Sequence, residues 1–197
     1  DHRDLHSFPT RRSSDLSCCT VLAFVNNFTK SRIEENQQKK VDVAMKEFFP
    51  SQGLTFETVL DFTPSVIGSI TVDGIYVAKK DSIIIGGAAQ VTGPTYDQGT
   101  ILVGMDTNGN ITGLKFLKLT DSPGFGLKAS DSTFILPSGK TFYGQFKGKN
   151  AKETFKVGEN FDAISGATIT SIAVSSLINQ GCKTLFSYFE KSHIGGE

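Results

Sequence analysis

The chain of 197 residues is predicted to adopt an α+β fold, in which a curved antiparallel sheet packs with helices. Between residues 70 and 120, short segments rich in β-branched residues alternate with turn sequences, a pattern typical of antiparallel strands. Before and after this region, apolar residues recur at the spacing typical of helices. An apolar segment near the start adds a truncated N-terminal membrane anchor helix to the expected architecture.

Residues 1–16, D-H-R-D-L-H-S-F-P-T-R-R-S-S-D-L, match the in-frame translation of a common sequencing-library adapter. We interpret them as an assembly artefact and leave them out of the fold prediction; a genuine polar, basic tail is the alternative. Their removal takes away three Arg and three Asp, so the net charge stays at zero, and it leaves His193 as the only histidine. This inventory argues against nucleic-acid binding, His-dependent triads and His-rich metal sites.

Residues 17–29 begin with the apolar run S-C-C-T-V-L-A-F-V, which is shorter than the roughly 20 residues that span a bilayer. We interpret them as the remnant of a transmembrane helix whose start has been lost. A short buried helix or the end of a secretion signal is the alternative. Lys30 and Arg32 follow the run, and the positive-inside rule would place them in the cytoplasm. Cys18, Cys19 and Cys182 form no metal-binding spacing and are expected to act as small apolar residues.

Residues 30–50 are predicted to form an amphipathic connecting helix that ends at Pro50. Its apolar side chains recur at helical spacing, and they are Ile33, Val41, Ala44, Met45 and Phe48. Residues 51–197 form the expected main domain, although the turn-rich stretch 51–69 predicts no particular element.

Strands are predicted at 75–78 and 82–89, around a turn at residues 79–81. A second pair, at 100–105 and 111–120, flanks the sequence D-T-N-G-N, in which Asn108-Gly109 is a strong hairpin signal. Residues 141–146 and 154–157 are expected to be a further strand or irregular structure.

The segment D-A-I-S-G-A-T-I-T-S, residues 162–171, brings a small-residue turn to the start of a predicted helix, with Thr168 in its first turn. A helix start offers unpaired N–H groups and a partial positive charge, so it favours phosphate. An ordinary capped helix start fits the same residues. Ser165 is the expected N-cap and Gly181 the expected residue after the helix end, which is followed by a second helix at 183–190. The expected apolar side consists of Ile169, Ile172, Ala173 and Leu177.

A second loop, T-D-S-P-G-F-G-L-K at residues 120–128, contains a rigid bend at Pro123, Gly124 and Gly126. Its exposed backbone N–H groups could contact a ligand, but on its own it fits an ordinary turn equally well.

The pattern D-x-x-S/T-G-A-T-x-T/S resembles the attachment motif of the FMN-binding domain family. The resemblance implies that a flavin transferase links FMN through its phosphate to the Thr168 hydroxyl. The motif residues implied to accompany it in the cofactor site are Asp162, Ser165, Gly166, Ala167 and Thr170.

The second loop resembles the family sequence E-T-P-G-L-G, which holds the flavin opposite the attachment helix. Asp121, Ser122 and Phe125 replace Glu, Thr and Leu, and a preceding His is missing. The residues implied to contact the cofactor are Ser122, Pro123, Gly124, Phe125 and Gly126.

Three further segments are similar in order and spacing to those of G subunits of Rnf electron-transport complexes. They are V-N-N-F-T-K-S-R-I (residues 25–33), Y-V-A-K-K-D (76–81) and I-L-V-G-M-D-T-N-G-N-I-T-G (101–113). C subunits of the sodium-translocating NADH:quinone reductase form the sister family. The resemblance implies an electron carrier in a membrane-bound, ion-translocating complex that works between ferredoxin and NAD, with the other subunits as partners. A single-pass anchor in the bacterial inner membrane would leave the flavin domain outside the cytoplasm, and no catalytic or metal-binding residue is expected. A stand-alone extracytoplasmic flavin domain and a non-redox membrane-tethered binding module are the alternatives.

Overall fold

A computed structural model describes residues 35–192. The chain divides into two compact units, residues 1–39 and 40–197. Residues 35–39 are the described part of the first unit; they are helical, and Lys39 forms a salt bridge of 2.7 Å with Glu35. The predictions for the adapter-derived segment, the anchor remnant, Cys18 and Cys19 lie outside the described residues. Within residues 35–192, no helix has the length and apolar character needed to cross a membrane.

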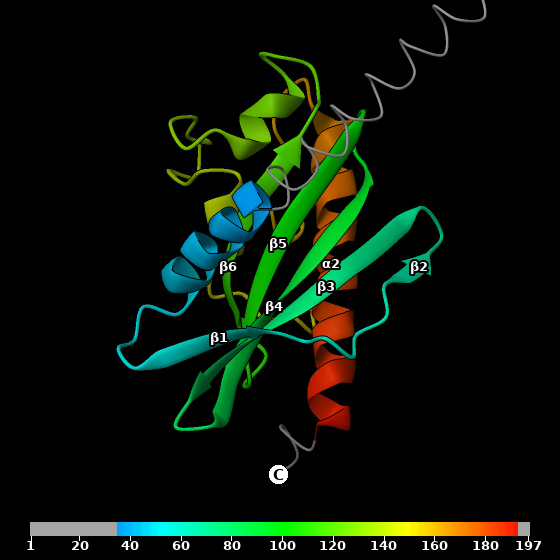
Figure 1. Ribbon diagram of the computed structural model, residues 1–197. Coiled ribbons are helices and arrows are strands. Elements are labelled where there is room, and N and C mark those ends of the chain that lie inside the picture. Colours follow the sequence, from blue (N-terminus) through cyan, green and yellow to red (C-terminus); the bar gives the residue numbers. More distant parts are fainter. Residues whose placement is uncertain (1–34, 193–197) are drawn as a thin grey trace, which may run out of the picture. The chain divides into compact units, whose positions relative to one another are not determined.

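The second unit contains a six-stranded antiparallel sheet (Figure 1). Its strands are β1 (Leu54–Thr58), β2 (Ser65–Ile67), β3 (Ile70–Lys80), β4 (Ile83–Pro94), β5 (Gln98–Asp106) and β6 (Ile111–Leu119). The order across the sheet is β1-β3-β4-β5-β6, and β2 also pairs with β3. The α+β class with an antiparallel sheet is therefore confirmed, and β1 and β2 occupy the stretch for which the sequence predicted no element.

The sheet is covered on both faces, by α2 (Thr168–Lys191) and by helical residues 40–48 (Figure 1). Because successive side chains of a strand point to opposite faces, Ile101 and Val103 of β5 join the core under α2, whereas Leu102 joins the core under the other helix. The predicted apolar side of residues 40–48 is confirmed, since Val41, Ala44, Met45 and Phe48 are all buried.

A hollow in the sheet receives the ring of Phe48. Gly104 of β5 and Gly113 of β6 are direct neighbours in the register, and a Cβ atom on either residue would overlap the Phe48 ring. These glycines therefore let the helix approach the sheet closely.

The prediction of two helices at the C-terminal end is wrong, because α2 is one continuous helix of 24 residues, Thr168–Lys191. Gly181 lies inside it and faces the sheet, where a Cβ atom would overlap Val103 Cγ1 and approach Val91 Cγ2 to 3.0 Å. Its small size thus serves close packing instead of a helix stop. Cys182 beside it is buried, and burial raises the pKa of its thiol to about 12, which fits the expected inert apolar role.

We expect Gly181→Ala to destabilise the protein by about 1–3 kcal/mol, because overpacking of a close helix–sheet contact outweighs the higher helix propensity of alanine. Urea unfolding of the purified protein measures the effect. Ser176→Ala on the exposed side of α2 is the matched control and should change stability by no more than about 0.5 kcal/mol. A stabilised Gly181→Ala protein would contradict the close contact.

Between β6 and α2 the chain forms no further strand, as one of the two alternatives for this region anticipated. Its regular elements are two short 3₁₀ helices, η1 (Gly126–Ser130) and η2 (Tyr143–Phe146). Isolated bridges such as Ile135 to Thr141 and Val157 to Phe161 complete its backbone pairing. This irregular region contains the predicted loop at residues 120–128 and leads into the predicted attachment segment, residues 162–171, whose last four residues begin α2.

Candidate functional site

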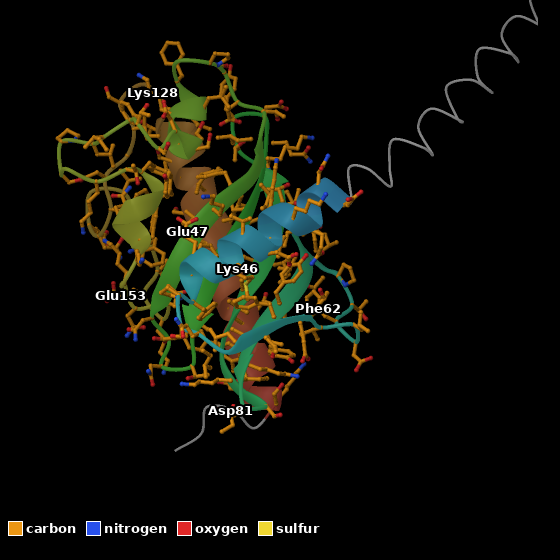
Figure 2. All side chains as sticks on the ribbon, turned by 60° about the vertical axis from the view of Figure 1, so that its left-hand side comes forward. Lys46, Glu47, Phe62, Asp81, Lys128 and Glu153 are labelled. Carbon is orange, nitrogen blue, oxygen red and sulfur yellow. The ribbon has the colours of Figure 1, made fainter. Side chains whose placement is uncertain are left out.

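A pocket of about 620 Å³ opens where three separate segments meet. The turn between β4 and β5 contributes Tyr96, the loop that begins at Ser122 contributes the next wall, and residues 166–170 at the start of α2 contribute the third. The pocket lies at the η1 end of the domain, near Lys128 and far from Asp81 of the β3–β4 turn (Figure 2). Its volume is within the range of small-molecule binding sites.

Most of the predicted site residues line this pocket. They are Ser122, Pro123, Phe125 and Gly126 of the loop and Gly166, Ala167, Thr168 and Thr170 of the helix start. The expected juxtaposition of the loop and the attachment motif is therefore found, although they are separated in sequence. The structure does not bring Gly124, Asp162 or Ser165 to the lining of this pocket.

Asp162 instead lines a separate polar pocket together with Lys140 and Lys149. Its backbone is held by the side chain of Gln145, which accepts a hydrogen bond of 2.8 Å from the Asp162 N–H and donates one of 3.0 Å to the Asp162 carbonyl. Asp162 as a whole is exposed.

The start of α2 differs from the expected capped terminus. Ala167, not Ser165, is the N-cap residue, and no side chain caps the helix. The first N–H groups of an α-helix have no acceptor within the helix, so this end remains free to bind an anion. Thr168 is exposed here, at the first helical position.

The turn before α2 is closed from inside the protein by Ser171. Its hydroxyl accepts a hydrogen bond of 3.0 Å from the Ile164 N–H and donates one of 2.9 Å to the Ala167 carbonyl. The Ala167 N–H donates to the Ile164 carbonyl at 2.9 Å. A fully buried serine thus fixes the turn and leaves the helix end open on the pocket side.

Gly166 and Phe125 bring the two predicted segments into contact. Gly166 has a φ of +77°, which L side chains rarely adopt, and a Cβ atom on it would lie 3.2 Å from Phe125 Cδ1. Phe125 is nevertheless 57% exposed, so much of its ring is available to a ligand in the pocket.

Behind the pocket, the buried carboxylate of Asp121 accepts four hydrogen bonds. Oδ1 accepts from the Thr95 hydroxyl at 2.5 Å and the Asp97 N–H at 2.9 Å. Oδ2 accepts from the Thr170 hydroxyl at 2.6 Å and the Tyr96 N–H at 3.3 Å. Burial alone would raise the pKa of Asp121, but these hydrogen bonds outweigh it and hold the pKa below its ordinary value.

A carboxylate with a lowered pKa in the folded state makes stability depend on pH. We expect the contribution of ionised Asp121 to be complete above about pH 4, the ordinary pKa of an unfolded aspartate, and to be lost as the pH falls through the lower folded pKa. Thermal unfolding of the wild type and of Asp121→Asn between pH 7 and about pH 2 measures it, since other carboxylates are common to both proteins. The difference between their midpoints should shrink below about pH 4, and a constant difference would contradict the assignment.

Sequence reasoning missed three residues at this site. Tyr96 and Ile169 line the pocket and are 67% and 62% exposed, respectively. Asp121 lies directly behind the pocket. An aromatic residue in the turn Pro94–Gln98 was a usable signal for Tyr96, because such a turn has no core in which to bury it. Ile169 was instead assigned to the buried side of the helix. That assignment is wrong for Ile169 and for Ile172, which is 50% exposed.

No group of three or more His, Cys, Asp or Glu side chains is arranged to hold a metal ion anywhere in residues 35–192. The donors that surround the pocket are backbone N–H groups and hydroxyls, and its walls are largely apolar and aromatic. This donor set suits a planar organic group that carries a phosphate.

Comparison with known proteins agrees with a pocket for such a group. The FMN-binding domain family matches residues 95–183, which include all three segments of the pocket. The G subunit of the Na(+)-translocating ferredoxin:NAD(+) oxidoreductase complex of Acetobacterium woodii is 33% identical over 184 residues, covering 84% of this chain and 83% of the relative. The G subunits of the ion-translocating oxidoreductase complexes of Salmonella typhi and Vibrio vulnificus are 30% and 27% identical, over 81% and 80% of this chain and 80% and 79% of their own lengths. The chain belongs to the family of G subunits of ion-translocating oxidoreductase complexes, and the part that matches the FMN-binding domain includes its pocket-forming segments.

Proposed function

We propose that this protein carries one FMN, linked through its phosphate to the hydroxyl of Thr168, and passes electrons within an ion-translocating oxidoreductase complex. The observation that carries the proposal is an exposed hydroxyl at an uncapped helix N-terminus on the wall of a ligand-sized pocket. Thr170 and Ser171, the neighbouring hydroxyls, are 2% and 0% exposed and already hydrogen-bonded, which favours Thr168 as the acceptor.

The helix start suits a phosphoester. Its free N–H groups and partial positive charge stabilise the phosphate oxygens after the Thr168 oxygen has bonded to phosphorus. Formation of that bond requires removal of the hydroxyl proton and departure of a group from phosphorus. We assign this chemistry to a flavin transferase, because the structure places no general base beside Thr168 among the residues that line the pocket.

The remaining pocket residues bind and orient the flavin. Phe125 and Tyr96 offer aromatic surface to a planar ring, and Ile169 adds an apolar wall that excludes water. When bound, FMN supplies the redox chemistry, and the protein sets its orientation and electrostatic environment. Asp162 is outside the pocket and exposed, so its proposed part is in attachment and not in contact with the bound ring.

The setting of the protein is proposed from its relatives and its sequence. Their names describe subunits of ion-translocating oxidoreductase complexes, and one name specifies a Na(+)-translocating ferredoxin:NAD(+) oxidoreductase. Ion translocation requires a membrane. We therefore assign residues 51–197 to the extracytoplasmic FMN domain, 30–50 to a connecting helix and 17–29 to a single-pass anchor in the bacterial inner membrane. Residues 1–16 are taken to be foreign to the natural protein, and the other complex subunits are the proposed partners.

The test uses membranes that contain the complete complex and a flavin transferase. In the intact complex, addition of a low-potential electron donor should bleach the absorption of the flavin that is covalently bound to this subunit, and NAD should restore it. Denaturation of a separate sample identifies that flavin, because it stays on the subunit. Reduction that bypasses this flavin would contradict the electron-carrier role. Isolation of the protein without the other subunits, but with a reducible covalent flavin, would favour service to another reductase.

A further inference from the structure

Asp121 joins the walls of the pocket through its hydrogen bonds. Its Oδ1 holds two residues of the β4–β5 turn, and its Oδ2 holds both that turn and Thr170 of α2. The loop packs on the same carboxylate, since a Cβ atom on Gly126 would lie 2.6 Å from Asp121 Oδ2 and 2.7 Å from Thr170 Oγ1. All three pocket segments therefore contact one side chain.

This carboxylate is not held there by a cation. Asp121 is 2% exposed, and none of the ion pairs in residues 35–192 includes it. A buried charge without a counter-ion is costly, and it persists only where hydrogen bonds compensate for lost hydration. Two threonine hydroxyls and two backbone N–H groups give that compensation, and all four come from segments that line or flank the pocket.

We propose that Asp121 is a positioning residue of the cofactor site, which fixes Tyr96 and the Thr168-bearing helix relative to one another and so sets the orientation and redox potential of the flavin. The proposal rests on the proposed function. Tyr96 is held through its own backbone N–H, so its ring has a defined starting point on the pocket wall. Thr170 is two residues from Thr168, so its hydroxyl bond fixes the first turn of the helix.

Asparagine cannot reproduce this arrangement. Each carboxylate oxygen accepts one hydrogen bond from a hydroxyl and one from a backbone N–H, whereas an amide has only one acceptor oxygen. In either orientation the NH₂ group of the introduced asparagine would oppose a backbone N–H, that of Tyr96 or that of Asp97. Asp121→Asn therefore removes the bridge on one side while preserving the volume of the side chain, and it also removes a negative charge.

The first measurement uses the flavin-free protein. Loss of a charge-assisted hydrogen bond predicts that the Tyr96 or Asp97 amide exchanges its hydrogen at least roughly tenfold faster in Asp121→Asn. Thr92→Val is the matched control. It removes another short Thr–Asp hydrogen bond, from Thr92 to Asp73 at 2.6 Å, at residues that do not line this pocket.

The second measurement uses protein loaded by a flavin transferase. Asp121→Asn and Thr170→Val should change the visible circular dichroism of the flavin, whereas Thr170→Ser and Thr92→Val should match the wild type. Asp121→Asn should also raise the flavin potential, because removal of a negative charge favours the reduced, more negative ring.

The outcomes separate the two proposals. A wild type that takes no flavin contradicts the proposed function, and the positioning role falls with it. A loaded wild type whose dichroism and potential are unchanged by both Asp121→Asn and Thr170→Val overturns the positioning role alone. If Asp121→Asn does not fold, the Thr170→Val and Thr170→Ser pair decides, since rescue by the serine hydroxyl supports the bridge and equal behaviour of the two contradicts it.

Discussion

Thr168→Val is expected to carry no flavin after denaturation, while its fold and stability remain close to those of the wild type. Valine keeps the branched shape of threonine and removes only the hydroxyl that would bond to phosphorus. Thr168 is exposed and caps nothing, so the substitution should alter the free energy of unfolding by no more than about 0.5 kcal/mol. The effect on attachment should be complete, because no neighbouring hydroxyl at the helix start is both exposed and on the pocket wall.

The measurement is flavin fluorescence on a denaturing gel after co-expression with a flavin transferase, supported by the intact mass. Thr168→Ser is the matched control, since it retains a hydroxyl at the same position and should retain at least part of the attachment. Flavin that survives denaturation on the valine variant would place the acceptor elsewhere, and the mass of the flavin-bearing peptide would identify it.

The sheet could be predicted largely from the sequence, because its central strands are long, apolar and separated by clear turns. Asn108-Gly109 predicted the β5–β6 hairpin, and Asp81 with Ser82 forms the β3–β4 turn through positive φ angles of 49° and 67°. The edge strands β1 and β2 escaped prediction because they are short: β1 has five residues, so its L-T-F-E-T alternation covers only a single short stretch, and β2 has three.

Helix α2 shows why periodicity alone misleads. Its inward side includes Thr170, Ser171 and Ser175, which are small polar residues that pack and hydrogen-bond, whereas Ile169 and Ile172 point outward. A pattern that assumes apolar residues inside therefore assigns Ile169 and Ile172 to the wrong side, whereas Leu177 is buried as predicted. Gly181 misled for a related reason, since a glycine that ends a helix and one that permits close packing look the same in sequence.

The site was predictable where it is local. The residues around Thr168 and Pro123 each form a short recognisable segment, and resemblance to a family paired them. The Asp121 bridge could not be predicted, because Asp121 bonds to Thr95 and to Thr170, which are 26 and 49 positions away from it in the sequence. Only the folded sheet brings these residues together. Such proximity depends on the register of β4, β5 and β6, which sequence patterns do not fix.

Phe146→Ala is expected to produce the largest loss of stability, about 3–5 kcal/mol, a cost typical of truncating a fully buried phenylalanine. Phe146 is 0% exposed, and its ring centroid lies 5.7 Å from that of Phe142 and 5.3 Å from those of Phe155 and Phe161. The irregular region between β6 and α2 has few backbone ladders, so this aromatic cluster supplies much of its cohesion. The loss would be a large part of the roughly 5–15 kcal/mol that stabilises a typical protein.

Chemical denaturation of the purified variants measures this effect, with Phe125→Ala as the matched control. Phe125 is 57% exposed, so the same truncation should cost little more than about 0.5 kcal/mol there, although it removes a wall of the proposed flavin site. The two variants should therefore separate stability from cofactor geometry: Phe146→Ala lowers the unfolding midpoint, whereas Phe125→Ala shifts the flavin spectrum in a protein of nearly normal stability.

A loss below about 1 kcal/mol for Phe146→Ala would mean that the cluster collapses around the cavity, since the cost of such truncations grows with the cavity that remains. Cohesion of the segment that leads into Thr168 would then have to come from hydrogen bonds such as those between the Gln145 side chain and the Asp162 backbone.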